Sequence, residues 1–184
     1  TAQFNDKSLQ PQWRRANVLF NMERTLIKPV VLQPGDAIGI AAPASPFDEK
    51  AFEEGVRILK SMGFVVKVSK GVFKRTGYLA GSDQERADLL MDLFRNTSIR
   101  AIFCARGGFG SMKILPLLDF HLIRANPKIL VGFSDITALS LAVYRHCHLV
   151  SLHGPLVTTL RKGTETTVEA LKSAMSSSNP PVLK

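Results

Sequence analysis

The sequence has few cysteines and no long apolar run, and both shortages narrow the class of protein. Cys104 and Cys147 are the only cysteines in 184 residues, too few for the disulfide framework of a small secreted domain. A low cysteine content fits a protein in a reducing compartment, or one whose folding does not depend on the redox state of its compartment. The longest apolar runs, such as residues 37–44, are far shorter than the roughly 20 residues of a membrane-spanning helix. We therefore expect no membrane partner.

The sequence also lacks the patterns of a metal, nucleotide or nucleic-acid site. The glycine-rich segment at 106–110 fits neither G-x-G-x-x-G nor the P-loop lysine pattern. His146 and His148 flank Cys147, but adjacent ligands without a second group make a poor zinc site. The net charge is +9, yet residues 31–160 hold fifteen Lys and Arg against eleven acids, an excess of only four. Because this charge is scattered, we expect no nucleic-acid partner. Because the nucleotide and zinc patterns are missing, we also expect no metal and no cofactor.

The sequence does contain a regular alternation of strand and helix patterns. Short apolar segments predict buried strands at 37–42, 64–68, 101–105, 128–132 and 149–152. Helical periodicity and caps predict helices at 48–62, 82–94, 111–118, 136–146 and 164–175, with a further short helix from residue 119. This order predicts an α/β fold: an open, mostly parallel sheet of about five strands, with helices on both faces.

The pattern divides the chain into three parts. Residues 1–29 are polar and basic and are expected to form an N-terminal extension. Residues 30–160 hold the α/β domain. Residues 161–184 hold the last helix and a Ser-, Asn- and Pro-containing linker. In an open parallel sheet ligands bind at the carboxyl ends of the strands, which directs attention to the loops that follow them.

One such loop carries Ser134 between an apolar strand and a helix. A serine at a sharp strand-to-helix turn exposes its hydroxyl, and the next amide stands at a helix N-terminus, where it can stabilise an oxyanion. The hydrolase elbow G-x-S-x-G is only partly matched, because Ile136 occupies its final position. The alternative is that Ser134 or Asp135 merely caps the helix, and the local pattern does not separate the two.

A second loop, at 106–110, has three glycines in four positions. Glycine permits positive φ angles and a close approach of the backbone to a ligand, so this loop can donate an amide to an oxyanion beside Ser134 or can be a turn forced by packing. Arg106 can bind a substrate carboxylate or hold the loop through backbone carbonyls. His153, at a strand end, is the best internal candidate for a base, although a structural role is favoured for it.

Together these segments resemble the LD-carboxypeptidases, the muramoyltetrapeptide carboxypeptidase family that includes the microcin C immunity peptidases. The resemblance spans roughly residues 30–160. It rests on LQPGD at 32–36, IGIAAPAS at 38–45, YLAGS at 78–82, RGGFG at 106–110, GFSDIT at 132–137 and HGP at 153–155. Each segment alone is weak, whereas their order is specific.

The resemblance implies that Ser134 is the nucleophile of an N-terminal domain. It implies an oxyanion hole of backbone amides, which we place at Asp135 and Gly108, with Arg106 and Gly107 as substrate-binding residues. It also implies a catalytic Glu and His in a C-terminal domain, so we expect the gene to continue beyond Lys184 and the isolated chain to be inactive. The implied reaction releases terminal D-alanine from murein tetrapeptides during cytoplasmic cell-wall recycling, by an enzyme that is commonly a homodimer.

Two other readings compete with the peptidase. The chain can be a non-catalytic module that holds a muropeptide or another small acidic ligand in the cleft at the strand ends. It can also be a nucleotide-binding doubly wound domain, which the glycine pattern disfavours.

Overall fold

The computed structural model describes residues 25–178 and contains one five-stranded sheet in which every neighbouring pair is parallel. The strands are β1 (Ala37–Ala41), β2 (Val65–Lys67), β3 (Ile99–Cys104), β4 (Ile129–Gly132) and β5 (Leu152–His153). Their order is β2-β1-β3-β4-β5. The chain thus leaves β1 towards one edge of the sheet and returns to build the other, which places the topological switch point between β1 and β3. The predicted α/β class is confirmed.

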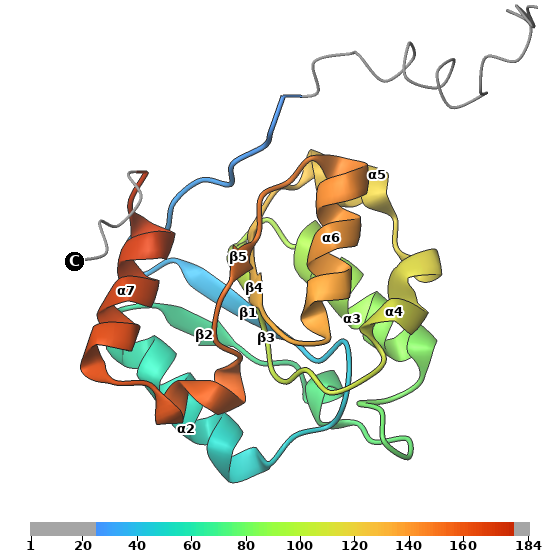
Figure 1. The fold of residues 1–184 in the computed structure, drawn as a ribbon, viewed down its shortest axis with the longest axis horizontal. Coiled ribbons are helices and arrows are strands. Elements are labelled where there is room, and N and C mark those ends of the chain that lie inside the picture. The colour runs from blue at the N-terminus through green and yellow to red at the C-terminus, as the bar shows by residue number, and fades with distance from the viewer. Residues whose placement is uncertain (1–24, 179–184) are drawn as a thin grey trace, which may run out of the picture.

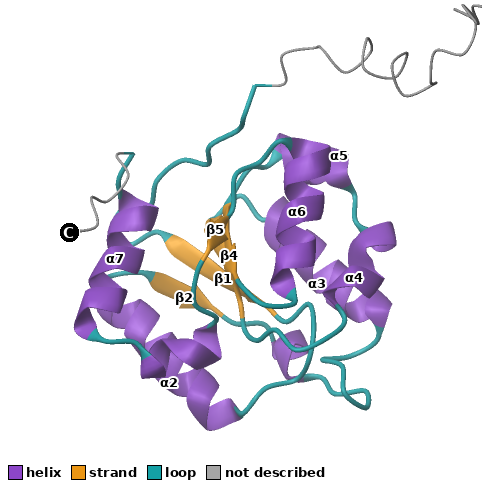
Figure 2. Cartoon of the chain, in the orientation of Figure 1, coloured by secondary structure: helices purple, strands orange, loops and turns teal. Residues whose placement is uncertain are grey.

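Helices cover both faces of this sheet (Figures 1 and 2). One face carries α2 (Glu49–Ser61), the 3₁₀ turns η1 (Lys70–Phe73) and η3 (Val157–Lys162), and α7 (Glu165–Ser176). The other carries α3 (Asp83–Arg95), α4 (Ser111–Ile114), the 3₁₀ turn η2 (Leu115–Leu117), α5 (Phe120–Ala125) and α6 (Ile136–Cys147). Each layer buries its own apolar cluster against the sheet, and burial of this apolar surface is the main force that holds the layers together.

Side-chain caps explain where several helices begin. The Asp48 carboxylate accepts from the Ala51 amide at the start of α2. Ser82 and Glu85 form the predicted capping box of α3. Such caps satisfy amides that have no partner inside the helix and contribute about 1 kcal/mol each. The starts of α2 and α3 therefore follow from the local sequence.

Two of the predicted elements differ clearly from the structure. The strand predicted at 149–152 is shorter: only Leu152 and His153 pair with β4, whereas Leu149 forms a parallel bridge with Ile27. The helix predicted at 111–118 splits into α4 and η2 at Pro116, because proline has no amide hydrogen to continue the α-helical pattern. Residues 1–24 of the predicted extension lie outside the described residues.

The last helix packs on the domain. Leu171 and Met175 of α7 are buried in the same apolar cluster as β1, and the Leu32 amide donates to the Met175 carbonyl at 2.8 Å. Among residues 25–178 no helix has the length and apolar character needed to cross a bilayer.

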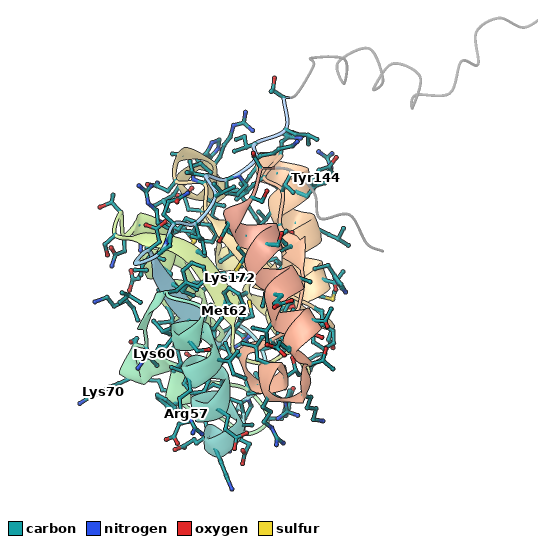
Figure 3. The ribbon with its side chains drawn as sticks, turned by 90° about the vertical axis from the view of Figure 1, so that its left-hand side faces the viewer. Arg57, Lys60, Met62, Lys70, Tyr144 and Lys172 are labelled. Atoms are coloured by element: carbon teal, nitrogen blue, oxygen red, sulfur yellow. The ribbon has the colours of Figure 1, made fainter. Side chains whose placement is uncertain are left out.

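Basic side chains on the face covered by α2 and α7 come from separate elements. Figure 3 looks onto this face, with Arg57 and Lys60 on α2, Lys70 on η1 and Lys172 on α7. All four are exposed. Their spread along the molecule resembles an ordinary solvated surface rather than a single binding stripe.

Candidate active site

Ser134 stands at the turn from β4 into α6, at the carboxyl edge of the sheet. The residue is exposed and has a φ of +63°. Positive φ is uncommon for a residue with a side chain and costs free energy, so the surrounding structure must enforce it. Gly132 helps: a Cβ there would lie 2.7 Å from Cγ2 of Ile136. The strand can therefore turn into the helix within three residues only because this position has no side chain.

The helix-capping alternative does not describe this turn. Asp135 occupies the N-cap position of α6, but its side chain makes no capping hydrogen bond. Its carboxylate instead accepts from the amide of Ser111 at 2.8 Å, and the Ser111 hydroxyl donates to the Asp135 carbonyl at 2.5 Å. Asp135 thus ties the start of α6 to the start of α4, and the Ser134 side chain is left at the surface.

The glycine loop after β3 lies directly against Ser134. A Cβ added to Gly107 would meet the Cβ of Ser134 at 3.1 Å and its Oγ at 3.3 Å. The absence of a side chain at Gly107 is therefore what lets this backbone approach the hydroxyl. The structure thus places Ser134 beside the loop at 106–110, and the use of this loop as an oxyanion donor stays a prediction.

Ser45, in the loop after β1, fixes the orientation of the glycine loop. The Ser45 amide donates to the Gly107 carbonyl at 3.2 Å, and the Phe109 amide donates to the Ser45 hydroxyl at 3.1 Å. A trans peptide points its C=O and N–H in opposite directions, so the Gly108 N–H points away from Ser45. β3 lies between β1 and β4, so the loop that carries this amide lies between the loop of Ser45 and the turn of Ser134.

The amide of Asp135 is also oriented by a hydrogen bond to the carbonyl of its own peptide group. The Ser134 carbonyl accepts from the Thr137 amide at 2.9 Å, inside the first turn of α6. The Asp135 N–H belongs to the same peptide and therefore points out of the helix, at the positive end of its dipole. Within residues 25–178, neither this amide nor that of Gly108 has a hydrogen-bond partner. One unpartnered amide thus directly follows Ser134 in the chain, and the other directly follows Gly107, the glycine that lies against Ser134.

Arg106 holds the loops together. Its Nη1 donates to the Pro46 carbonyl at 2.7 Å, and its side chain is exposed. This contact matches the loop-holding alternative for Arg106, and its part in substrate binding stays a prediction.

Arg86 on α3 had no predicted role and lies beneath the site. It is 1% exposed, donates to the carbonyls of Pro43 and Gly110, and pairs with Asp83. A signal was present in the sequence: Arg86 stands four residues before Leu90, on the face of α3 that enters the core. A cation at an inward-facing position calls for buried acceptors.

The histidines and cysteines make no second centre in the described part of the chain. His153 is exposed opposite Gly132, and its ring centroid lies 6.2 Å from that of Phe133. The His146 ring stacks on Phe120. Complete burial raises the pKa of the Cys104 thiol to about 12, which leaves it protonated and unreactive. Among residues 25–178 no group of three His, Cys, Asp or Glu is placed to hold a metal ion.

Comparison with known proteins identifies the family. Residues 38–154 match the model of the LD-carboxypeptidase N-terminal domain. A probable murein peptide carboxypeptidase of Bacillus subtilis is 44% identical over 132 residues, covering 72% of this chain and 41% of the relative. A murein tetrapeptide carboxypeptidase of Pseudomonas aeruginosa is 38% identical over 130 residues, covering 70% of this chain and 42% of the relative.

The fold is shared with solved structures. The crystal structure of an MccF-like protein from Bacillus anthracis superposes with a TM-score of 0.78 at 31% identity, covering 82% of this chain and 47% of that one. The chain spans about half the length of the relatives it matches. The sequence segments, the parallel sheet and the matched domain all point to one family. The chain belongs to the LD-carboxypeptidase family.

Proposed function

We propose that the protein is a serine-type LD-carboxypeptidase that releases terminal D-alanine from murein tetrapeptides through an acyl-enzyme on Ser134. The observation that carries the proposal is the exposed Ser134 at positive φ, in contact with Gly107 and flanked by two unpartnered amides. The relatives named as murein carboxypeptidases support the substrate class.

The proposed reaction is acyl transfer in two steps. The Ser134 hydroxyl loses its proton to a base and attacks the carbonyl that precedes D-alanine. The tetrahedral oxyanion is held by the amides of Gly108 and Asp135, and its collapse expels D-alanine, whose amine takes up a proton. Water then attacks the ester and restores the hydroxyl. Rigid amides aimed at the developing charge need no reorganisation during the reaction.

In this proposal the general base lies in the part of the protein that corresponds to the unmatched half of the relatives. The family resemblance implies a Glu and a His in a C-terminal domain, and none of the four histidines of this chain takes their role. No cofactor takes part. The proposal places the reaction in the cytoplasm, in peptidoglycan recycling, with the enzyme as a homodimer, and the chain alone is then expected to be inactive.

Release of D-alanine by the complete gene product tests the proposal. Ser134→Ala is expected to lower kcat at least about 10⁴-fold, whereas Ser140→Ala, the same substitution farther along α6, is expected to leave it unchanged. D-alanine is measured with D-amino-acid oxidase, and the acyl-enzyme is sought by mass spectrometry. Unchanged turnover by Ser134→Ala would remove Ser134 from the mechanism. Binding of the tetrapeptide by the wild type without turnover would favour a binding module instead.

The same assay separates two substrate classes. A peptidyl-nucleotide of the microcin type is offered beside the murein tetrapeptide, because an MccF-like protein shares the fold. A higher kcat/KM for the tetrapeptide is expected. A higher value for the peptidyl-nucleotide would reassign the substrate but keep the role of Ser134.

A further inference from the structure

Arg86 is a fully buried cation in the helix that packs beneath the candidate site. Its side chain has 0% exposure, while that of its ion-pair partner Asp83 has 40%. Burial removes the guanidinium from water at a high free-energy cost, and an apolar side chain of similar size often stabilises a protein as well or better. Stability alone therefore gives no reason for an arginine at this position.

The two carbonyls that Arg86 binds belong to two different loops at the switch point. Nη1 donates to the Pro43 carbonyl in the loop after β1, and to the Gly110 carbonyl at 2.9 Å, at the end of the glycine loop. A side chain at Gly110 would crowd this contact, since its Cβ would lie 2.6 Å from Cδ2 of Leu79 and 3.1 Å from the same nitrogen. A rigid, planar guanidinium thus fixes the position of one loop relative to the other.

The peptide group that joins Gly110 and Ser111 is hydrogen-bonded through both its C=O and its N–H. The Gly110–Ser111 peptide gives its C=O to Arg86 and its N–H to the Asp135 carboxylate, at 2.9 Å and 2.8 Å. A planar peptide held at both ends cannot rotate without losing both bonds. The chain of contacts therefore runs from Arg86 through this peptide to the residue directly after Ser134.

We propose that Arg86 is a positioning residue that holds the amides of Gly108 and Asp135 in place for the oxyanion. The proposal rests on the proposed function. Gly108 lies two residues before the peptide that Arg86 holds, and Asp135 is bonded to that peptide directly. Arg86 has no hydrogen bond to Ser134 and its side chain is fully buried, so it acts only through the backbone of the glycine loop.

Lys128 provides a matched control. It is 5% exposed and donates to the carbonyls of Asn96 and Ile99 at 2.8 Å and 2.6 Å. Like Arg86 it is a buried cation with two backbone acceptors, but these acceptors lie at the other end of β3. Arg86→Met and Lys128→Met each remove a buried cation from two backbone carbonyls, and Arg86→Met also removes the ion pair with Asp83. Only the contacts of Arg86 reach the glycine loop.

The test compares the complete gene product with its Arg86→Met, Arg86→Lys and Lys128→Met variants, below the melting temperature of each. Arg86→Met is expected to lower kcat about 10²-fold, the scale of one lost oxyanion donor, with KM within about threefold since substrate contacts remain. Lys128→Met is expected to keep kcat within about twofold. Arg86→Lys, which keeps the charge but not the planar fork, is expected to fall between wild type and Arg86→Met.

Hydrogen exchange at 107–111 gives a readout that does not depend on turnover. Faster exchange in this segment is expected for Arg86→Met and Arg86→Lys but not for Lys128→Met. Wild-type exchange there, or a kcat loss no larger than that of Lys128→Met, would overturn the inference. If Arg86→Met does not fold, wild-type kcat and exchange in Arg86→Lys would overturn it equally. Full activity of Ser134→Ala would instead refute the proposed function, and the exchange result would still decide whether Arg86 holds the loop.

Discussion

Replacing Gly108 with alanine separates the backbone strain of the glycine loop from its role in the reaction. Gly108 has a φ of +100°, where a residue with a side chain costs about 1 to 2 kcal/mol. The new Cβ would also lie 2.5 Å from Oγ and 2.8 Å from Cβ of Ser45. Ser45 must then move and lose its hydrogen bond from Phe109, at a cost of about 1 kcal/mol. The expected destabilisation is about 2 to 3 kcal/mol.

Gly63 supplies the control for this substitution. Its φ is +97°, and a Cβ there would meet nothing within 4 Å. Gly63→Ala therefore has the same backbone strain without the collision, and it lies at the end of α2 rather than beside Ser134. We expect it to cost about 1 to 2 kcal/mol and to leave kcat unchanged.

The two variants are compared by urea unfolding and by release of D-alanine from the complete gene product. Gly108→Ala is expected to lose about 10² to 10³ in kcat, because a displaced amide no longer faces the oxyanion. The reasoning is refuted if Gly108→Ala keeps kcat within about threefold of wild type. It is also refuted if Gly108→Ala is no less stable than Gly63→Ala, since the collision with Ser45 would then have no consequence.

Two further predictions concern titratable groups. Because burial raises the pKa of the Cys104 thiol to about 12, we expect no reaction of Cys104 with Ellman's reagent in the folded protein at pH 8, and rapid reaction in urea; labelling of the native state would contradict this burial. The pKa of Glu85 is lowered to about 2, chiefly by its hydrogen bond from Lys74 and then by those from Ser82. Since the unfolded value is about 4.3, Glu85 stabilises the fold above about pH 4, and this contribution is lost as the pH falls towards 2. Thermal unfolding from pH 7 to 2 should show a shallower decline for Glu85→Gln, and parallel curves would count against the capping contacts.

Local patterns were enough to predict most elements of the fold. The alternation of apolar strands and amphipathic helices depends on contacts within a few residues, as does the capping box at Ser82 and Glu85. The short β5 was overestimated, because Leu149 is apolar like its neighbours but pairs with Ile27 instead of β4. An apolar residue indicates burial, whereas its partner in the sheet depends on distant parts of the chain.

The amino-acid sequence by itself determined the alternation of strands and helices and the position of the turn at Ser134, because periodicity and caps act locally. Only the tertiary structure decided how closely the glycine loop approaches Ser134 and which residues hold that loop in place. Ser45 and Phe109 are 64 residues apart, and Arg86 and Pro43 are 43 apart. Such contacts form only when β1 and β3 lie side by side, so a local sequence pattern cannot predict them.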